Sequence, residues 1–327
     1  MDNMLLSVKE LTTVFDTDKG RVVAVNGVSF DIEKGKTLCL VGESGSGKSI
    51  TSLSIMRLIE KPGKIIKGEI LLNGQNLMNL TEKEMRKVRG KKISMIFQEP
   101  MTSLNPSYTI GFQIKEVLKL HQPELSKKEI HDKAVESLKL VGIPSAEERL
   151  KDYPFKLSGG LRQRVMIAMA MACEPELLIA DEPTTALDVT IQAQVLALMK
   201  ELQEKKGTSI LFITHDLGVV YEMAHDVAVM YTGNIVEKGS KKTIFDEPKH
   251  PYTQGLIASI PSSHRGGRKS RLYSIEGNVP SLYNLPKGCT FWPRCPFAKE
   301  ICKTEKPKLK EITDGHFVAC FKAEGVF

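Results

Sequence analysis

The residues that most clearly indicate chemistry form one loop, Gly42-Glu43-Ser44-Gly45-Ser46-Gly47-Lys48-Ser49. It fits the pattern G-x-x-x-x-G-K-[ST] and lies between an apolar run at 36–41, expected as a buried strand, and a helical run at 50–59. Glycines let successive backbone N–H groups wrap a phosphate, and a helix N-terminus adds positive potential. Lys48 supplies a charge for the β- and γ-phosphates, and Ser49 offers a hydroxyl ligand for Mg²⁺. The loop therefore predicts a nucleotide phosphate site.

Two adjacent carboxylates form the second candidate group. The apolar run 177–180 ends at Asp181 and Glu182. Asp181 can hold Mg²⁺ or its water shell, and Glu182 can polarise a water in line with the γ-phosphate. An Asp-Glu pair alone also occurs in ordinary loops, so the inference depends on the phosphate loop upstream.

Alternating strands and helices are expected to position these groups. The runs 177–180 and 209–213 are predicted to be buried strands, and apolar residues at helical spacing mark a helix between them. Such an order is typical of a parallel sheet with crossover helices, which is an α/β fold. Short strands are expected in the first 30 residues, and Asn73-Gly74 predicts the turn of a hairpin. Ser126 and Glu129 have the spacing of a capping box, which predicts a helix after them.

Composition limits the protein classes that are possible. The chain has 327 residues, a length that predicts about two domains. Hydrophobic residues make up 41% of it, which is ordinary for a folded protein. A net charge of +7 is too small to make nucleic acid the expected partner. The start carries Asp2 and no basic-then-apolar region, and no run reaches the ~18 apolar residues of a membrane span. We therefore expect a cytoplasmic protein that reaches a membrane only through partners.

The predicted domain boundary is near residue 240. Residues 1–240 are expected to form an ATPase domain, with a helical subdomain at about 105–172. Prolines, glycines, a basic cluster at 264–271 and four of the six cysteines follow, with little helical period. Residues 241–327 are therefore expected to form a small, irregular extension.

A further motif, Leu157-Ser158-Gly159-Gly160-Leu161-Arg162-Gln163-Arg164, makes the interpretation specific. Together with the phosphate loop and the acidic strand, it resembles the signature sequence of ATP-binding-cassette (ABC) ATPases. The other motifs follow in that family's order: Gln98, then Ala186-Leu187-Asp188 after the acidic pair, then His215. The run 98–106 and the cysteine-rich tail further resemble the ATPase subunits of dipeptide/oligopeptide importers.

The resemblance implies an ABC fold: a parallel core sheet with helices, an antiparallel β subdomain and a helical signature subdomain. It implies a head-to-tail dimer in which two ATP molecules lie between one phosphate loop and the opposing signature. The backbone N–H groups of Ser158, Gly159 and Gly160 and the hydroxyl of Ser158 suit a γ-phosphate. Gln98 would then sense Mg²⁺ and the attacking water, His215 would contact the γ-phosphate, and Asp188 would link the two sites.

Two positions leave alternatives open. Phe15 is predicted to stack on adenine, since the family has an aromatic residue in this first turn, with apolar packing as the alternative. Leu161 stands where many members have Gln and cannot hydrogen-bond a ribose. Peptide-importer subunits commonly carry an apolar residue there, so it does not indicate an inactive enzyme.

Four cysteines, Cys289, Cys295, Cys302 and Cys320, crowd into the tail. None forms the C-x₂₋₄-C pair that is usual for structural zinc, whereas an iron–sulfur cluster tolerates wider spacing. The importer resemblance includes members whose tail holds a [4Fe–4S] cluster, so we expect that cluster, with Zn²⁺ and free thiols as the alternatives. An ordering role in a small tail is the simpler hypothesis than a redox role.

The sequence thus predicts a cytoplasmic ATPase that drives di- or oligopeptide import at the inner face of the cell membrane. Its expected partners are a paralogous ATPase subunit or a second copy, two transmembrane permease subunits and, indirectly, an extracytoplasmic peptide-binding protein. An oligosaccharide or nickel cargo is the first alternative. A soluble ABC ATPase acting on ribosomes or DNA is the second, although the chain has one cassette and no coiled-coil insertion. Intact Lys48, Asp181 and Glu182 argue against a scaffold without activity.

Overall fold

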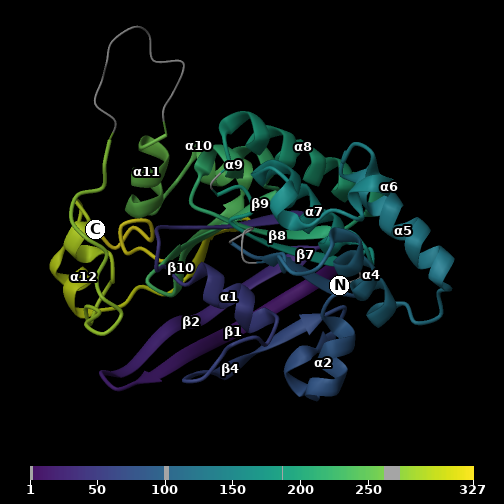
Figure 1. Ribbon diagram of the computed structural model, residues 1–327. Helices are drawn as coiled ribbons and strands as arrows, with labels where there is room; N and C mark the ends of the chain where they lie inside the picture. The colour runs from purple at the N-terminus through teal and green to yellow at the C-terminus, as the bar shows by residue number, and fades with distance from the viewer. Residues whose placement is uncertain (1–2, 99–102, 186, 261–272) are drawn as a thin grey trace, which may run out of the picture. The chain divides into compact units, whose positions relative to one another are not determined.

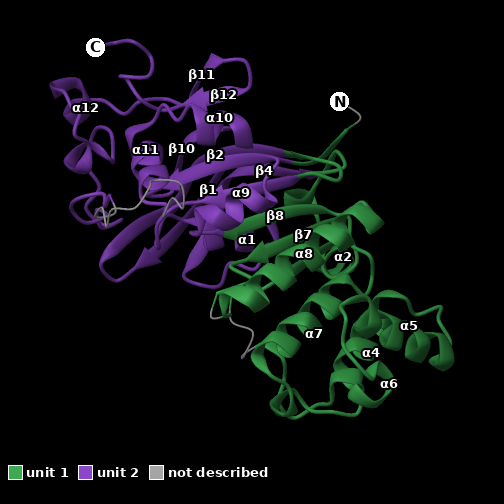
Figure 2. Ribbon diagram, turned by 90° about the horizontal axis from the view of Figure 1, so that it is seen from above, with its two compact units in different colours: residues 1–6, 32–36, 72–213 green, residues 7–31, 37–71, 214–327 purple. Residues whose placement is uncertain are grey.

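The structure is a computed structural model that describes residues 3–98, 103–185, 187–260 and 273–327. The chain forms two compact units, one made of residues 1–6, 32–36 and 72–213 and the other of 7–31, 37–71 and 214–327 (Figure 2). Three predictions fall partly or wholly outside the described residues. These are the middle of the run 98–106, Ala186 and the basic cluster at 264–271.

The first unit contains three parallel strands, which lie side by side in the order β6 (Ile93–Ile96), β7 (Leu177–Asp181) and β8 (Ser209–Thr214). All residues of β7 and β8 are buried, as the apolar runs predict. The other elements of this unit are mostly helices (Figure 1): β5 (Gln75–Asn76), η1 (Leu77–Asn79), α2 (Glu82–Val88), α4 (Ile110–His121), α5 (Lys127–Leu140), α6 (Ala146–Arg149), η2 (Pro154–Lys156), α7 (Gly159–Met171) and α8 (Val189–Lys206).

Local sequence explains where the helices of this unit begin. The predicted capping box is confirmed at α5, where the Ser126 hydroxyl accepts the Glu129 N–H at 3.3 Å and the Glu129 carboxylate accepts the Ser126 N–H at 2.8 Å. Apolar residues of α5 at helical spacing are buried, among them Ile130, Ala134 and Leu138. Because that apolar face contacts α4 and α7, tertiary packing adds to the local signal.

The second unit begins with a long hairpin of β1 (Met4–Thr17) and β2 (Gly20–Glu33), whose ends extend into residues of the first unit. β4 (Gly63–Leu72) lies beside β1, and β5 follows through a turn in which both Asn73 and Gly74 have positive φ, as the Asn-Gly pair predicts. The remaining elements are β3 (Thr37–Val41), α1 (Lys48–Ile55), α9 (Leu217–Met223), β9 (Asp226–Tyr231), β10 (Asn234–Ser240), α10 (Lys241–Asp246), α11 (Pro251–Ala258), η3 (Trp292–Arg294), α12 (Glu300–Thr304), β11 (Lys310–Thr313) and β12 (His316–Val318).

A second group of paired strands runs through this unit. β3 is parallel to β9, whereas β9 and β10, β10 and β12, and β12 and β11 are antiparallel pairs. The C-terminal extension therefore contributes two strands that continue from β10, in addition to its irregular segments. It also contributes Phe291, whose ring packs against Tyr231 and Tyr252 at centroid distances of 5.3 and 5.4 Å. All three of these rings are buried.

None of the helices in the described part of the chain combines the length and the hydrophobicity that a membrane crossing requires.

Candidate active site

The phosphate loop connects β3 to α1 in the second unit, which is the strand–loop–helix context that the sequence predicts. Two of its glycines leave no room for a Cβ. Gly42 has φ +153°, and a Cβ there would lie 2.2 Å from the carbonyl oxygen of Met230. Gly47 has φ +101°, and its Cβ would lie 2.5 Å from the carbonyl oxygen of Ala24. The loop is therefore packed tightly against backbone on two sides.

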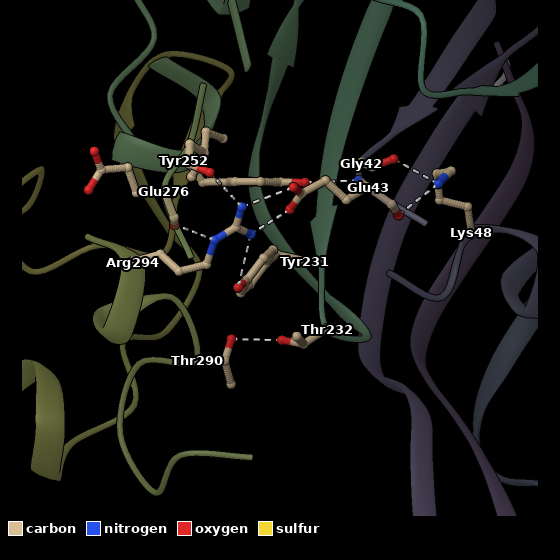
Figure 3. Close-up of polar contacts among 10 residues, drawn as sticks. Gly42, Glu43, Lys48, Tyr231, Thr232, Tyr252, Glu276, Thr290 and Arg294 are labelled. Carbon is tan, nitrogen blue, oxygen red and sulfur yellow. Dashed lines mark hydrogen bonds and ion pairs between the residues drawn. The ribbon is translucent and has the colours of Figure 1, made fainter. Parts of the chain in front are cut away.

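Lys48 is folded back over this loop. Its Nζ donates to the carbonyl oxygens of Gly42 at 2.8 Å and Glu43 at 3.1 Å, and the residue is 5% exposed (Figure 3). The Ser46 hydroxyl is buried and has no hydrogen-bond partner among the described residues. A charged amine and a buried polar atom beside a helix N-terminus suit an anionic ligand, so the loop fits the phosphates of a nucleotide.

The carboxylate pair lies at the carboxyl end of β7 in the first unit. Asp181 is 3% exposed and is opposite Ile213 of β8. Glu182 has φ +47°, which is unusual for a residue with a side chain, and its N–H donates to the Ile213 carbonyl at 2.9 Å. This turn directs the chain away from the sheet immediately after the strand, and such strained positions are frequent at functional sites.

Gln98 and Glu182 are brought together across neighbouring strands. Ile96 pairs with Ala180, and each candidate residue lies two positions beyond one member of that pair. The Gln98 Nε2 donates to Glu182 Oε2 at 3.2 Å, and the hydroxyl of Thr185 donates to the same oxygen at 3.1 Å. The carboxylate of Glu182 is thus oriented by two neutral donors.

The signature motif forms the first turn of α7. The Ser158 hydroxyl accepts the Leu161 N–H at 3.4 Å as an N-cap, and Asp188 caps α8 by accepting the Ile191 N–H at 2.9 Å. A Cβ on Gly160 would lie 2.8 Å from Cγ2 of Ile191, so the starts of α7 and α8 are in close contact. A Cβ on Gly159 would have no atom within 4 Å, so that side of the motif is open.

Phe15 and His215 occupy the second unit with the phosphate loop. Phe15 is half-buried and lies against Gly63, where an added Cβ would be 2.6 Å from its Cε1, so the ring has a packing role in this structure. His215 is exposed directly after β8, and Asp216 follows it as the N-cap of α9. The predicted magnesium ligands are all oxygen donors, as Mg²⁺ prefers: Ser49 in the second unit, and Gln98 and Asp181 in the first.

Sequence reasoning missed four residues that hold the site residues. Thr185 hydrogen-bonds to Glu182, and the buried Gln163 of α7 donates to the carbonyl of Pro183, next to Glu182. The Tyr252 hydroxyl accepts the N–H of Glu43, and Arg294 forms an ion pair with the Glu43 carboxylate. Gln163 lies within the signature motif and Thr185 lies close after the acidic pair, which is the signal that could have indicated them. Tyr252 and Arg294 carry no such signal.

The four tail cysteines line one small cavity together with apolar groups, among them Phe291, Trp292 and Phe321. None of the four forms a disulfide, and burial raises the pKa of Cys289 to about 11. Among the described residues, however, no group of three or more His, Cys, Asp or Glu side chains has the arrangement of a metal site. The predicted iron–sulfur cluster and its zinc alternative are therefore not confirmed.

Comparisons with known proteins agree with this geometry. Residues 25–185 match the family described as ABC transporter, and residues 236–302 match the oligopeptide/dipeptide transporter C-terminal region. The chain is 56% identical to the oligopeptide transport ATP-binding protein AppD of Bacillus subtilis, over 98% of this chain and 97% of that protein. The chain belongs to the family of dipeptide and oligopeptide ABC transporter ATP-binding proteins.

Other members of this family and its solved relatives support the assignment. The dipeptide transport ATP-binding protein DppD of Escherichia coli is 49% identical over 97% of this chain and 96% of its own length. The dimeric ATP-binding cassette MJ0796, solved in a post-hydrolysis state with ADP and Pi, is 28% identical with a TM-score of 0.65, over 72% of this chain and 99% of that one. The predicted ABC ATPase fold is therefore confirmed, and the chain is an ATP hydrolase whose activity is coupled to transport.

Proposed function

We propose that this ABC ATPase powers the import of di- or oligopeptides from the cytoplasmic face of the cell membrane, as a peripheral subunit. The match to transporters named for these cargoes, which includes their C-terminal region, is the observation that carries the proposal. Its partners would be two transmembrane permease subunits, a second ATPase subunit that is either a paralogue or another copy, and a separate peptide-binding protein. Residues 1–240, with a helical subdomain at 105–172, would form the ATPase domain, and 241–327 its extension.

In the proposed mechanism Lys48 and the loop N–H groups bind the phosphates, and Phe15 contacts the adenine. Mg²⁺, when bound, would neutralise phosphate charge beside Ser49 and Asp181. Glu182, oriented by Gln98, accepts a proton from the attacking water, while His215 contacts the γ-phosphate. Ser158, Gly159 and Gly160 would bind the γ-phosphate held by the partner subunit, and Asp188 would link the two sites.

Replacement of Glu182 tests this mechanism. Glu182→Gln removes the base but preserves the shape of the side chain, so we expect ATP turnover to fall by about 10²-fold or more while ATP affinity is retained. Steady-state phosphate release and nucleotide titration measure the two quantities. Glu201→Gln neutralises an exposed carboxylate of α8 that pairs with Lys205 and should leave both unchanged. Normal turnover by Glu182→Gln would refute the assignment of the base.

The cargo can be tested separately in cells that encode the same substitution. Uptake of labelled di- and tetrapeptides should be lost with Glu182→Gln and retained with Glu201→Gln. If Glu182→Gln abolished nickel or oligosaccharide uptake but left peptide uptake normal, the cargo would be nickel or an oligosaccharide instead of a peptide. The proposed ATPase mechanism would be unaffected.

We also propose that the four tail thiols hold a [4Fe–4S] cluster. Their convergence on one cavity supports this.

Metal analysis after anaerobic purification tests the cluster. We expect about four iron and four sulfide per chain. Cys295→Ser should lose them, whereas Cys173→Ser, which changes a buried thiol outside the tail, should retain them. One zinc per chain, or no metal even after reconstitution with iron and sulfide, would contradict the proposal.

A further inference from the structure

A guanidinium from the C-terminal extension forms an ion pair with the phosphate loop. Arg294, the last residue of η3, donates from Nη1 to Glu43 Oε2 at 2.6 Å and from Nη2 to Oε1 at 3.0 Å (Figure 3). The two residues are 251 positions apart in the sequence. The side chain of Arg294 is only 4% exposed and that of Glu43 is 31% exposed, so solvent screens this bidentate pair poorly.

The other donors of Arg294 fix its orientation. Nε donates to the carbonyl of Glu276 at 3.1 Å, and Nη2 also donates to the carbonyl of Ile275 at 3.3 Å. Nη1 of Arg294 also donates to the hydroxyl oxygen of Tyr231 at 3.5 Å. Each of these groups belongs to the extension or to the end of β9. The guanidinium is therefore held in one orientation, with Nη1 and Nη2 directed at the Glu43 carboxylate.

Glu43 is in turn held at three points. Arg294 pairs with its carboxylate, the Tyr252 hydroxyl accepts its N–H at 2.9 Å, and Lys48 donates to its carbonyl at 3.1 Å (Figure 3). Glu43 thus connects the extension with the amine of Lys48, which in the proposed function binds the phosphates. Loss of Arg294 would leave a partly buried carboxylate unpaired in the middle of this loop.

We propose that Arg294 is a positioning residue, which holds the phosphate loop in the shape that binds ATP and couples the extension to the nucleotide site. Its segment is fixed at both ends by cysteines: the Cys289 carbonyl accepts the Trp292 N–H at 3.1 Å, and the Trp292 carbonyl accepts the Cys295 N–H at 3.2 Å. The inference depends on ATP binding at the loop and not on the identity of the cargo.

Coupling of this kind is reciprocal, so ATP binding must also be sensed in the extension. The chain provides a probe for it, because Trp292 of η3 is the only tryptophan. We expect the emission of Trp292 to change when ATP is added to the full-length chain in the Glu182→Gln background, which prevents turnover.

Substitution of Arg294 tests the proposal. Arg294→Gln should raise the dissociation constant for ATP about tenfold and abolish the response of Trp292. In chains with Glu182 intact it should raise KM with little change in kcat. Arg294→Lys keeps the charge without the fork and should show an intermediate loss. Glu43→Gln should match Arg294→Gln, and the double variant should be no weaker than either, because both act through one pair.

Two controls separate this role from a general loosening of the extension. Lys310→Gln breaks an ion pair with Glu324 inside the extension, and Thr290→Val removes a buried 2.7 Å hydrogen bond to Thr232. Both variants should bind ATP normally and retain the Trp292 response. Wild-type affinity of Arg294→Gln with a normal response would overturn the proposal. An equal loss in Thr290→Val would also overturn it, because the effect would then come from the extension as a whole. If Arg294→Gln does not fold, Arg294→Lys and Glu43→Gln decide between the same outcomes.

Discussion

Glu182, the proposed base, illustrates how the backbone can fix the direction of a single side chain. Its left-handed conformation costs ~1–3 kcal/mol relative to a relaxed residue. The hydrogen bond from its N–H to Ile213 and the two side-chain donors on its carboxylate hold it there. The backbone strain and these hydrogen bonds together fix the direction of the Glu182 carboxylate.

Residues of this kind differ in how far the sequence predicts them. Lys48, Asp181 and Glu182 belong to short motifs whose context of strand and loop is local, so their positions could be foreseen. The contact of Arg294 with Glu43 joins residues 251 positions apart and depends on the packing of the whole extension. No local pattern encodes such a pair. Phe15 differs from both cases, because it is expected in the first turn and the structure places it in β1 against Gly63.

At the scale of elements, α7 and α8 give the two signature glycines different tasks. Gly159→Ala adds a methyl group into open space, so we expect normal thermal stability. If this face meets the γ-phosphate of the partner subunit, the same variant loses ATPase activity. Gly160→Ala places a Cβ 2.8 Å from Ile191 of α8, so it should lower the free energy of unfolding by about 1–3 kcal/mol. Thermal melts and phosphate release on both variants distinguish the two tasks.

A second-site change controls the experiment on Gly160. Ile191→Ala removes the side chain that a new methyl group would strike, so the double variant Gly160→Ala/Ile191→Ala should recover stability relative to the sum of the single changes. Full activity of Gly159→Ala would argue against a phosphate contact on this side of the motif. Additive losses in the double variant would show that Ile191 is not the cause of strain.

The elements themselves were predicted where the signal is local and missed where it is not. The capping box placed the start of α5, and uninterrupted apolar runs placed β3, β7 and β8. β11 and β12 escaped prediction because they are short, because β11 has no buried residue, and because they exist through pairing: β12 pairs with β10, and β11 pairs with β12. Strand pairing across ~80 residues depends on tertiary context more than on propensity.

At the scale of the whole molecule, the extension (241–327) shares a core with the rest of the second unit. Phe291 packs against Tyr231 at the end of β9 and against Tyr252 of α11, and His250 lies beside it at a ring distance of 5.7 Å. The buried Glu237 of β10 accepts the N–H of His250 at 3.0 Å and lies 2.7 Å from His316 of β12. Because these contacts cross from one part of the unit to the other, loss of the extension would expose apolar and charged groups together.

His250 makes the stability of this core depend on pH. Burial lowers its pKa from about 6.5 to about 3, since the ring is enclosed and its Nδ1 accepts the Tyr252 N–H. The unfolded chain binds a proton below pH 6.5 that the folded chain does not bind, so stability present above pH 6.5 is lost as the pH falls towards 3. Between pH 7 and pH 5 this loss should be about 2 kcal/mol.

A variant of His250 tests this prediction. His250→Asn keeps an acceptor for the Tyr252 N–H but does not titrate, so urea melts should show a shallower dependence of stability on pH than in the wild type. Equal slopes for the two proteins would mean that the buried ring is not the group responsible.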